Sequence, residues 1–461
     1  MISDLKPYAN YKESGLPWLD TVPKHWDVAP NRALMRDQRE VVGARASGYT
    51  LLSLTLRGVI ARDMVNPKGK FPAQFSTYKV VKPDDFVFCL FDIDETPRGV
   101  GLSPLKGMIT GAYDVFSPTS RINARFLYYY YLFVDEGKLM KPLYTGLRKT
   151  IQRGVFSSLK APLPPPDEQA AIVRLLDWAN GRLERAIRAK RKVIALLNEQ
   201  KQAIIHRAVT RGLDPSVPLK PSGISWLGDI PQHWTLKRFK FLATINSGQV
   251  DPRKAEYRDL VLIAPNHIQS GSGRLLKQET AEDQGADSGK YLVRRGQIIY
   301  SKIRPNLCKA AIAPCDCLCS ADMYPIDPTT GELSTDYLLL LLLSQPFTKF
   351  AVDTSMRVAM PKVNREALAN CLMWYPGANE QSLIREFIAR EAAPIDAAIT
   401  RLEREIELLR EYRTRLVADV VTGKLDVRHA AARLPDETPL DTIADAAKLG
   451  DETEAADEEV A

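Results

Sequence analysis

The chain has 461 residues and a mass of 51.6 kDa, which exceeds one ordinary domain, so two or three domains are expected. Hydrophobic residues make up 45% and charged residues 26%, a balance that excludes a disordered or fibrous protein. The longest uncharged runs, 126–134 and 338–343, are far shorter than a bilayer span of ~20 residues, and the first residues lack a secretory signal. We therefore expect a cytoplasmic protein whose six cysteines are reduced thiols.

The formal net charge of +7 hides an asymmetry along the chain. Residues 434–461 contain ten Asp and Glu residues and a single Lys, a net charge of −9, which leaves about +16 on the remaining residues. A basic body suits a polyanion such as nucleic acid. The acidic end is typical of a solvated, disordered tail, which we predict over 429–461.

The first landmark along the chain is the opening segment KESGLPWLDTVPKHW at 12–26, which recurs as KPSGISWLGDIPQHW at 220–234. Eight of the fifteen positions are identical, and both tryptophans are among them. Paired tryptophans with Gly and Pro are typical of an entry turn that packs at the start of a domain. The recurrence predicts two domains of one kind in a single chain.

Two variable stretches, 27–160 and 235–375, follow these openings. Their β-branched and aromatic runs, punctuated by Gly and Pro, predict two mixed α/β domains. VVKPDDFVFC, ending at Cys89, matches LVRRGQIIYS, ending at Ser301, as a turn that leads into a buried strand. RFLYYYYLF and DYLLLLLLS match as a buried helix.

Two helices of 44 residues each, 167–210 and 379–422, are predicted after these domains. Each begins at Glu-Gln, ends at Thr-x-x-Leu-Asp, and spans about 66 Å if wholly helical. Pro394 predicts a kink or break in the second helix. Apolar side chains at steps of four and three predict a coiled-coil seam: Leu183, Ile187, Ile194, Leu197, Ile204 and Ala208, then Ile395, Ile399, Leu402, Ile406, Leu409, Leu416 and Val420. Lys201 and Arg413 match as one polar seam position that could fix the register.

In this arrangement the chain resembles the specificity (S) subunit of type I restriction–modification systems over about residues 11–428. The resemblance rests on the paired openings, the helix starts LPPPDEQAAI and YPGANEQSLI, and the helix ends TRGLD and TGKLD. It implies an α+β fold: two target recognition domains separated by two long antiparallel coiled-coil helices, in a pseudo-twofold internal repeat. We place the first recognition domain at 1–166, the first spacer helix at 167–212, the second domain at 213–378 and the second spacer helix at 379–428.

The resemblance also implies a function in defence against foreign DNA. Each recognition domain would read one half of an asymmetric, bipartite site in double-stranded DNA. The helices would dock two methyltransferase (modification) subunits, and restriction (motor–nuclease) subunits would complete the complex. Methylation would occur at adenine N6, with S-adenosylmethionine, ATP and magnesium on the partner subunits and no cofactor on this chain.

Candidate DNA contacts come from polar, basic, loop-like stretches, because Lys and Arg bind phosphates while Arg, Asn, Gln, Ser and aromatic side chains read base edges. In the first domain these are Arg45, Ser47, Tyr49, Lys68, Lys70, Arg148, Lys149, Gln152 and Arg153. In the second domain they are Asn266, His267, Arg274, Lys302, Arg304, Asn306, Arg357 and Lys362.

Sequence motifs of catalysis are absent. There is no Asn/Asp-Pro-Pro-aromatic methyltransferase motif, no phosphate loop, no His-Glu-x-x-His metal site and no nucleophile elbow, so we expect a non-catalytic subunit. Cys315, Cys317 and Cys319 alternate as on one face of a strand, where they would pack as small hydrophobes instead of binding zinc. Two alternatives stay open: a stand-alone DNA nuclease or modifying enzyme, and a coiled-coil scaffold that does not read DNA.

Overall fold

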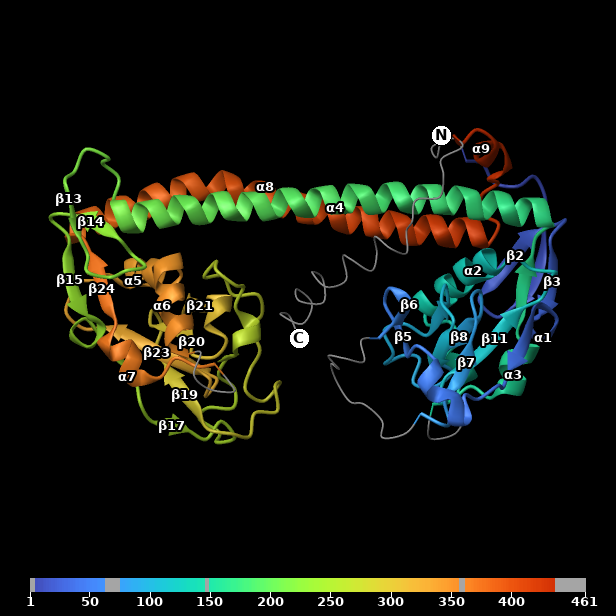
Figure 1. The fold of residues 1–461 in the computed structure, drawn as a ribbon, viewed down its shortest axis with the longest axis horizontal. Helices are drawn as coiled ribbons and strands as arrows, with labels where there is room; N and C mark the ends of the chain where they lie inside the picture. The colour runs from blue at the N-terminus through green and yellow to red at the C-terminus, as the bar shows by residue number, and fades with distance from the viewer. Residues whose placement is uncertain (1–4, 63–74, 146–148, 356–360, 436–461) are drawn as a thin grey trace. The chain divides into compact units, whose positions relative to one another are not determined.

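The computed structural model describes residues 5–62, 75–145, 149–355 and 361–435. They form two compact units (Figure 1). Unit 1 contains the described residues up to 189 and from 404 onward, and unit 2 contains 190–403. The candidate residues Lys68, Lys70, Arg148 and Arg357 lie outside the described residues, as does most of the acidic C-terminal segment.

Unit 1 is built on a four-stranded antiparallel sheet with the order β4-β11-β8-β9. Its strands are β4 (Met35–Gln38), β11 (Asp114–Pro118), β8 (Phe86–Phe88) and β9 (Val100–Leu102). Four antiparallel pairs surround it: β1 (Tyr11–Leu16) with β2 (Leu19–Pro23), β3 (Asp27–Pro30) with β12 (Lys160–Leu163), β5 (Leu52–Thr55) with β6 (Gly58–Ala61), and β7 (Lys79–Val81) with β10 (Gly107–Ile109). The helices are α1 (Asn31–Leu34), α2 (Ala124–Glu136) and α3 (Arg153–Ser158).

Aromatic side chains fill the core of unit 1. Phe88 on β8 packs against Tyr131 on α2 and Phe156 on α3, with ring centroids 5.0 and 4.8 Å apart. Asn123 caps α2 by accepting hydrogen bonds from the two backbone amides that follow Ala124. The run of tyrosines thus forms the buried helix that its apolar character predicted, because α2 covers the aromatic face of the sheet.

Unit 2 contains two four-stranded sheets. The first has the order β16 (Ala243–Ile245), β23 (Met323–Pro328), β20 (Ile298–Ser301), β21 (Ala310–Ile312). The second has the order β17 (Gln249–Val250), β19 (Lys290–Val293), β22 (Cys317–Cys319), β18 (Leu262–Ile263), and β18 and β22 run parallel. β13 (Leu219–Pro221) pairs with β14 (Asp229–Pro231), and β15 (Thr235–Arg238) pairs with β24 (Leu372–Tyr375). The helices are α5 (Thr335–Leu342), α6 (Gln345–Ser355) and α7 (Arg365–Asn370).

The alternating cysteines lie on and beside β22. Cys317 and Cys319 are fully buried, and burial raises the pKa of Cys317 to about 12, so both thiols stay protonated and pack as apolar groups. The described residues contain no group of three or more His, Cys, Asp and Glu side chains arranged to hold a metal ion.

Two long helices are present, as the sequence predicted: α4 (Pro166–Arg211) and α8 (Ala378–Val421). Of the kink or break predicted at Pro394, the break is wrong, because α8 continues through that residue. Pro394 is exposed, so water can hydrate the carbonyl that lacks an amide partner, while Ala392 and Ile395 beside it are buried and hold the helix in place. Among the described helices none is long and apolar enough to cross a membrane.

The apolar positions predicted for a helical seam are buried or half-buried. Ile187, Ala208, Ile395, Ile399, Ile406, Leu416 and Val420 are buried, and Leu183, Ile194, Leu197, Ile204, Leu402 and Leu409 are half-buried. By contrast, Val193 and Leu196 on α4 are about half exposed. Each helix therefore has one covered apolar face and further apolar side chains that no described residue covers.

The acidic tail begins later than we predicted. Residues 428–432 form a short helix, α9, and both Ala431 and Leu434 are buried in the core of unit 1. Arg428 binds the carboxylate of Asp426 through two nitrogens, at 2.6 and 3.0 Å, which anchors the chain before α9. The segment after α8 is thus part of the folded unit, because its apolar side chains Ala431 and Leu434 pack in the core of unit 1.

Candidate nucleic-acid interface

A clipped loop follows a central strand of the four-stranded sheet in each unit. In unit 2 the loop after β20 reaches Arg304, whose φ of 46° is left-handed. The backbone amide of Arg304 donates to the carbonyl of Pro361 at 3.3 Å, and the amide of Val363 donates to the carbonyl of Lys302 at 2.8 Å. These two bonds fix the loop against the segment that enters α7.

The loop after β8 in unit 1 is clipped in the same way. Asp92 has a φ of 44°, its amide donates to the carbonyl of Lys149 at 3.1 Å, and the amide of Ile151 donates to the carbonyl of Leu90 at 2.7 Å. This clip holds the loop against the segment that enters α3. The two clipping hydrogen bonds and one left-handed residue are therefore common to both loops, although Lys149 is also left-handed, with a φ of 44°, where Pro361 is not. The side chains at the shared left-handed position differ in charge.

The clip in unit 2 brings four of the candidate residues onto one surface. Arg304, Asn306 and Lys362 are exposed, and Lys302 is half-buried. The ammonium of Lys302 donates to the carbonyl of Ala321 at 2.5 Å and lies 5.4 Å from the ring centre of Tyr324. Segments that are 60 residues apart thus form one basic surface, which we call the clip surface of unit 2: Lys302, Arg304, Asn306, Lys362 and Arg365.

Arg365 is a member of the clip surface that sequence reasoning missed. Its guanidinium lies 5.0 Å from the ring centre of Tyr324 and donates to the carbonyls of Ile245 and Asn246 at 2.9 and 2.7 Å. In the sequence, only its position three residues after the candidate Lys362 indicated that Arg365 could belong to this surface. Within the described chain none of the four cations on this surface forms an ion pair with a carboxylate. Arg304 and Lys362 are exposed, while Lys302 and Arg365 lie near the ring of Tyr324 and donate to backbone carbonyls.

The candidate cations of unit 1 that the structure describes have carboxylate partners instead. Lys149 pairs with Glu95 at 2.6 Å and Asp94 at 3.4 Å, and the hydrogen bond with Glu95 raises the pKa of Lys149. Arg153 pairs with Asp114 and, at 3.8 Å, with Asp37. These side chains must exchange a carboxylate for a phosphate before they contact nucleic acid.

The remaining candidates of unit 1 are polar surface groups. Arg45 pairs with Glu40 at 3.1 Å, and Ser47 beside it is exposed. Tyr49 is half-buried against a small apolar cluster. Gln152 is exposed at the first position before α3, where its side chain makes no capping hydrogen bond. The side-chain amide of Gln152 is therefore exposed at the start of α3 and is not used to cap the helix.

The last three candidates of unit 2 lie on a second pair of segments, but one of them faces inward. Asn266 and Arg274 are exposed, and an antiparallel bridge between Ile268 and Leu275 joins the two segments that carry them. His267 is only 3% exposed, and its Nδ1 lies 3.2 Å from the carbonyl oxygen of Leu262. Burial lowers the pKa of His267, so the ring is neutral and structural, and we leave it out of the interface.

The tryptophan openings meet the Glu-Gln helix starts in both units. In unit 1 the carboxylate of Glu168 is bound by His25 at 2.8 Å and by the indole Nε1 of Trp26 at 2.9 Å. In unit 2 the carboxylate of Glu380 is bound by His233 at 2.7 Å and by Trp234 at 3.1 Å. Each opening thus ties the first turn of a long helix to the domain before it.

The glutamines of the same motif seal the next turn. Gln169 donates to the carbonyl of Pro164 at 2.8 Å and accepts from the amide of Asn123 at 2.6 Å. Gln381 donates to the carbonyl of Pro376 at 2.9 Å and accepts from the amide of Ser334 at 2.9 Å. The repeated motif is therefore a structural anchor, and the clipped loops remain the candidate interface.

Known proteins with similar sequences come from one family. Residues 231–408 match the profile described as "Type I restriction modification DNA specificity domain". The type I restriction enzyme EcoDI specificity subunit of Escherichia coli is 29% identical over 328 residues, which cover 67% of this chain and 72% of that protein. The MjaVIII specificity subunit of Methanocaldococcus jannaschii is 22% identical over 291 residues, 60% of this chain and 65% of that protein.

A solved structure supports the same fold. One chain of a structure that describes complex assembly and conformational transition of a type I R-M system superposes with a TM-score of 0.55 at 15% identity. The match covers 87% of this chain and 98% of that one. The sequence similarities thus all point to one family, and this chain is similar to the specificity subunits of type I restriction–modification systems, with the DNA specificity domain matched over residues 231–408.

Proposed function

We propose that this chain reads an asymmetric, bipartite site in double-stranded DNA, one half with each unit, and presents it to methyltransferase and restriction subunits. The observation that carries the proposal is the pair of clipped loops, which share two backbone hydrogen bonds and one left-handed position but differ in their side chains. Asp92 stands in unit 1 where Arg304 stands in unit 2, and Lys149 stands where Pro361 stands. A shared frame with divergent side chains fits two readers of two different half-sites.

We infer that the two units are copies in a pseudo-twofold repeat, with recognition domains at 1–166 and 213–378. The anchor, the clip and the glutamine seal each occur once in each unit. The end of each long helix supports the same view. Gly423, after α8, lies against Pro23 and Trp26 in unit 1, and Gly212, after α4, lies against Pro231 and Trp234 in unit 2.

The spacer helices, at 167–212 and 379–428, form an antiparallel coiled coil in this proposal. Lys201 pairs with Asp396 at 2.7 Å, and Glu184 pairs with Arg413 at 3.3 Å. Glu184 and Lys201 are 17 residues apart on α4, and their partners Arg413 and Asp396 are also 17 residues apart on α8. Both ion pairs therefore fit one antiparallel register. The polar seam positions Lys201 and Arg413 thereby set the register, and helix length sets the distance between the half-sites.

The DNA contacts proposed for unit 2 are the clip surface together with Asn266 and Arg274. Those proposed for unit 1 are Arg45, Ser47, Tyr49, Lys149, Gln152 and Arg153, along with Lys68, Lys70 and Arg148 outside the described residues. Lys302 and Lys362 suit phosphates, while Arg304 and Asn306 have the planar donor groups that read base edges. Arg357 extends the set outside the described residues.

Catalysis belongs to other subunits of the complex, so this chain supplies specificity. We infer that two methyltransferase subunits dock on the long helices, where apolar side chains are exposed: Val193, Leu196, Leu408 and Tyr412. S-adenosylmethionine would bind to those subunits, and ATP and magnesium would serve the restriction subunits. The transferred methyl group would go to adenine N6.

The decisive experiment is to express this chain with its candidate methyltransferase partner in a host that lacks the modification, and then map methylated adenines across the genome. A single asymmetric motif with two specified halves and an unspecified spacer is the expected result. A stable complex that produces no new methylation would overturn the proposal in favour of a scaffold. Methylation or cleavage by the purified chain alone would instead indicate a stand-alone enzyme.

A further inference from the structure

The main attachment of unit 2 to α4 lies in the last turns of that helix. The indole Nε1 of Trp374 donates to the carbonyl oxygen of Val209 at 2.7 Å, and Gly212 lies against Trp234, whose indole is bound to Glu380. A domain that is held at one end of a helix alone can pivot about that end. Its reading loops would then sweep over more than one position along a DNA duplex.

Gln202 provides a second attachment, two turns before Val209. Its side-chain Nε2 donates to the carbonyl oxygen of Gly271 at 3.1 Å, and the Gln202 side chain is half-buried. Seven residues separate Gln202 from Val209, a distance of about 10 Å along the helix axis. Two attachments this far apart on one helix resist the pivoting that a single attachment allows.

Gly271 in turn contacts the clip surface of unit 2. Its φ of 65° lies in the left-handed region that glycine adopts readily. Its backbone amide donates to the carbonyl oxygen of Cys308 at 3.1 Å, and Cys308 ends the short 3-10 turn that begins after Arg304. Two hydrogen bonds therefore join Gln202 on α4 to the loop that carries Arg304.

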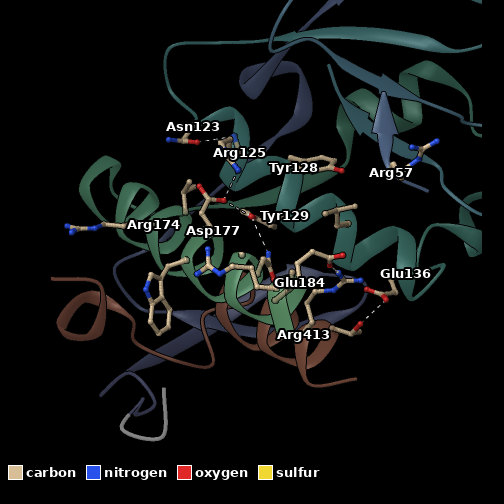
Figure 2. A pocket seen from close by; sticks show the side chains of 18 of the residues that line it. Arg57, Asn123, Arg125, Tyr128, Tyr129, Glu136, Arg174, Asp177, Glu184 and Arg413 are labelled. Atoms are coloured by element: carbon tan, nitrogen blue, oxygen red, sulfur yellow. Dashed lines mark hydrogen bonds and ion pairs between the residues drawn. The ribbon is translucent and has the colours of Figure 1, made fainter. Parts of the chain in front are cut away.

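The corresponding position on α8 makes a contact of the same kind in unit 1. Thr414 stands 212 residues after Gln202, the offset that also relates Arg413 to Lys201. The hydroxyl of Thr414 donates to Oε1 of Glu136, at the end of α2, at 2.9 Å. Thr414 and Glu136 line the pocket drawn in Figure 2, where the dashed line from Glu136 marks this hydrogen bond.

The end of α2 is also joined to the clipped loop of unit 1. The ammonium of Lys138, two residues after Glu136, donates to the carbonyl of Thr96 at 2.8 Å. The backbone amide of Thr96 donates to the carbonyl of Asp92, the left-handed residue of that loop, at 2.9 Å. In each unit, then, a polar side chain of a long helix is linked through one short segment to the clipped loop.

Helix geometry explains why both attachments directly follow a polar seam position. Successive residues of an α-helix point about 100° apart. Lys201 pairs with Asp396 on α8, and the next residue, Gln202, reaches the domain instead. Arg413 and Thr414 repeat this division of contacts in unit 1. The register of the helices and the orientation of each domain are thus fixed at neighbouring residues.

We propose that Gln202 and Thr414 are positioning residues, which hold each recognition domain against its long helix and so restrict the protein to one spacer length. This inference rests on the proposed bipartite reading of DNA. One base pair moves a half-site by about 3.4 Å along the duplex and turns it by about 35°, so the orientation of a domain helps to decide which spacer fits. Gln202 contributes more than Thr414, because it is half-buried while Glu136 is exposed and can bind water instead.

The test compares Gln202→Ala with Asn198→Ala in the full-length chain, each expressed with the methyltransferase partner. Asn198 is a matched control, since it lies one turn earlier on α4, is exposed, and makes no side-chain hydrogen bond with the part of the chain that the structure describes. In maps of methylated adenines, Gln202→Ala should keep both half-site sequences. It should raise several-fold the share of sites whose spacer is one base pair longer or shorter, whereas Asn198→Ala should keep the single spacer.

A merely destabilising substitution would lower methylation at all sites without broadening the spacer. A spacer as sharply defined in Gln202→Ala as in the unchanged chain would therefore overturn the proposal. Thr414→Val removes the hydroxyl and keeps the shape of the side chain, and it should broaden the spacer less than Gln202→Ala.

Amide hydrogen exchange tests the attachment without DNA. In the full-length chain, Gln202→Ala should increase exchange several-fold in segments 268–276 and 303–309, while exchange in the buried strand β20 stays the same. Unchanged exchange in both segments would overturn the proposal by itself. The two failures are distinguishable, because an unchanged chain that yields no bipartite motif would count against the proposed function, whatever the exchange shows.

Discussion

The indole Nε1 of Trp26 donates a hydrogen bond to the carboxylate of Glu168 at 2.9 Å, although 142 residues separate the two in the sequence. Glu168 is buried, and His25 and the hydroxyl of Tyr8 bind the same carboxylate. One side chain in the first turn of α4 thus holds three donors from the opening of the chain, and it does so where the helix N-terminus favours negative charge.

Glu168→Ala should therefore destabilise unit 1 strongly. The substitution leaves three donors without an acceptor, a loss of roughly 2–4 kcal/mol of unfolding free energy. Urea denaturation followed by tryptophan fluorescence measures the loss. The exposed neighbour Asp167→Ala is the control and should lose less than about 1 kcal/mol. Equal losses in both variants would contradict the anchoring role of Glu168.

Asp426 should stabilise the fold in a pH-dependent manner. Its hydrogen bonds with Arg428 lower the pKa of the Asp426 carboxyl below its usual value. A depressed folded-state pKa contributes stability above the unfolded value of about 3.9, and this stability is lost as the pH falls through the folded value. Asp426→Asn should thus lower the unfolding midpoint modestly at pH 7, and this deficit should shrink as the pH falls below about 3.9. A deficit that persists at the lowest pH would exclude this ion pair as its source.

Pro394→Ala should stabilise α8. The alanine restores a backbone amide in an exposed helix interior, a gain on the order of 1–3 kcal/mol. Thermal unfolding of the full chain measures it, with Ala393→Gly as a control of opposite sign at the adjacent exposed position. A lower melting temperature for Pro394→Ala would mean that packing on α8 requires the proline geometry.

Arg304→Gln should weaken one half of the DNA site and not the other. Arg304 is exposed at the left-handed position of the clip surface, where a bidentate contact to a base would contribute about 1–3 kcal/mol of discrimination. Mapping of methylated adenines should show relaxed specificity in a single half-site. Lys349→Gln is the control, since Lys349 is an exposed cation of unit 2 paired with Asp353 on α6. Relaxation in both half-sites would refute modular reading.

A paired insertion should lengthen the unspecified spacer. Seven residues inserted into each long helix, after Lys190 in α4 and at the matching turn of α8, add about 10.5 Å while keeping the antiparallel register. At about 3.4 Å per base pair, the spacer should grow by roughly three base pairs with both half-sites intact. An insertion in α4 alone should instead destabilise the chain, because Lys201 would lose Asp396. Recovery of the original spacer length would exclude the helices as a ruler.

Local patterns in the sequence were sufficient for the elements that depend on periodicity. The apolar steps from Leu183 to Ile204 belong to α4, and the uncharged run around Tyr130 forms the buried helix α2. Helical periodicity relates residues three or four positions apart, so it can be recognised without knowing which distant residues pack against the helix. Pro394 shows the limit of this reasoning, because neighbouring buried side chains outweigh the local preference of one residue.

The candidate interface depended on contacts between distant residues. Lys149 and Arg153 look like free cations in the sequence, yet the fold supplies Glu95 and Asp114 as partners. His267 looks like a surface donor, but its strand neighbours bury it. No periodicity encodes such pairings, since they arise only when sheets and loops pack together.

The sequence by itself was enough to predict the two long helices, and it also predicts two domains of one kind, because duplicated motifs and helical periods are written in neighbouring residues. Only the tertiary structure decided which cations of the clip surface lack a carboxylate partner among the described residues, and that Ala431 and Leu434 enter the core of unit 1. Charge and burial at a surface depend on what the rest of the fold places beside each side chain, and this is a property of three-dimensional packing.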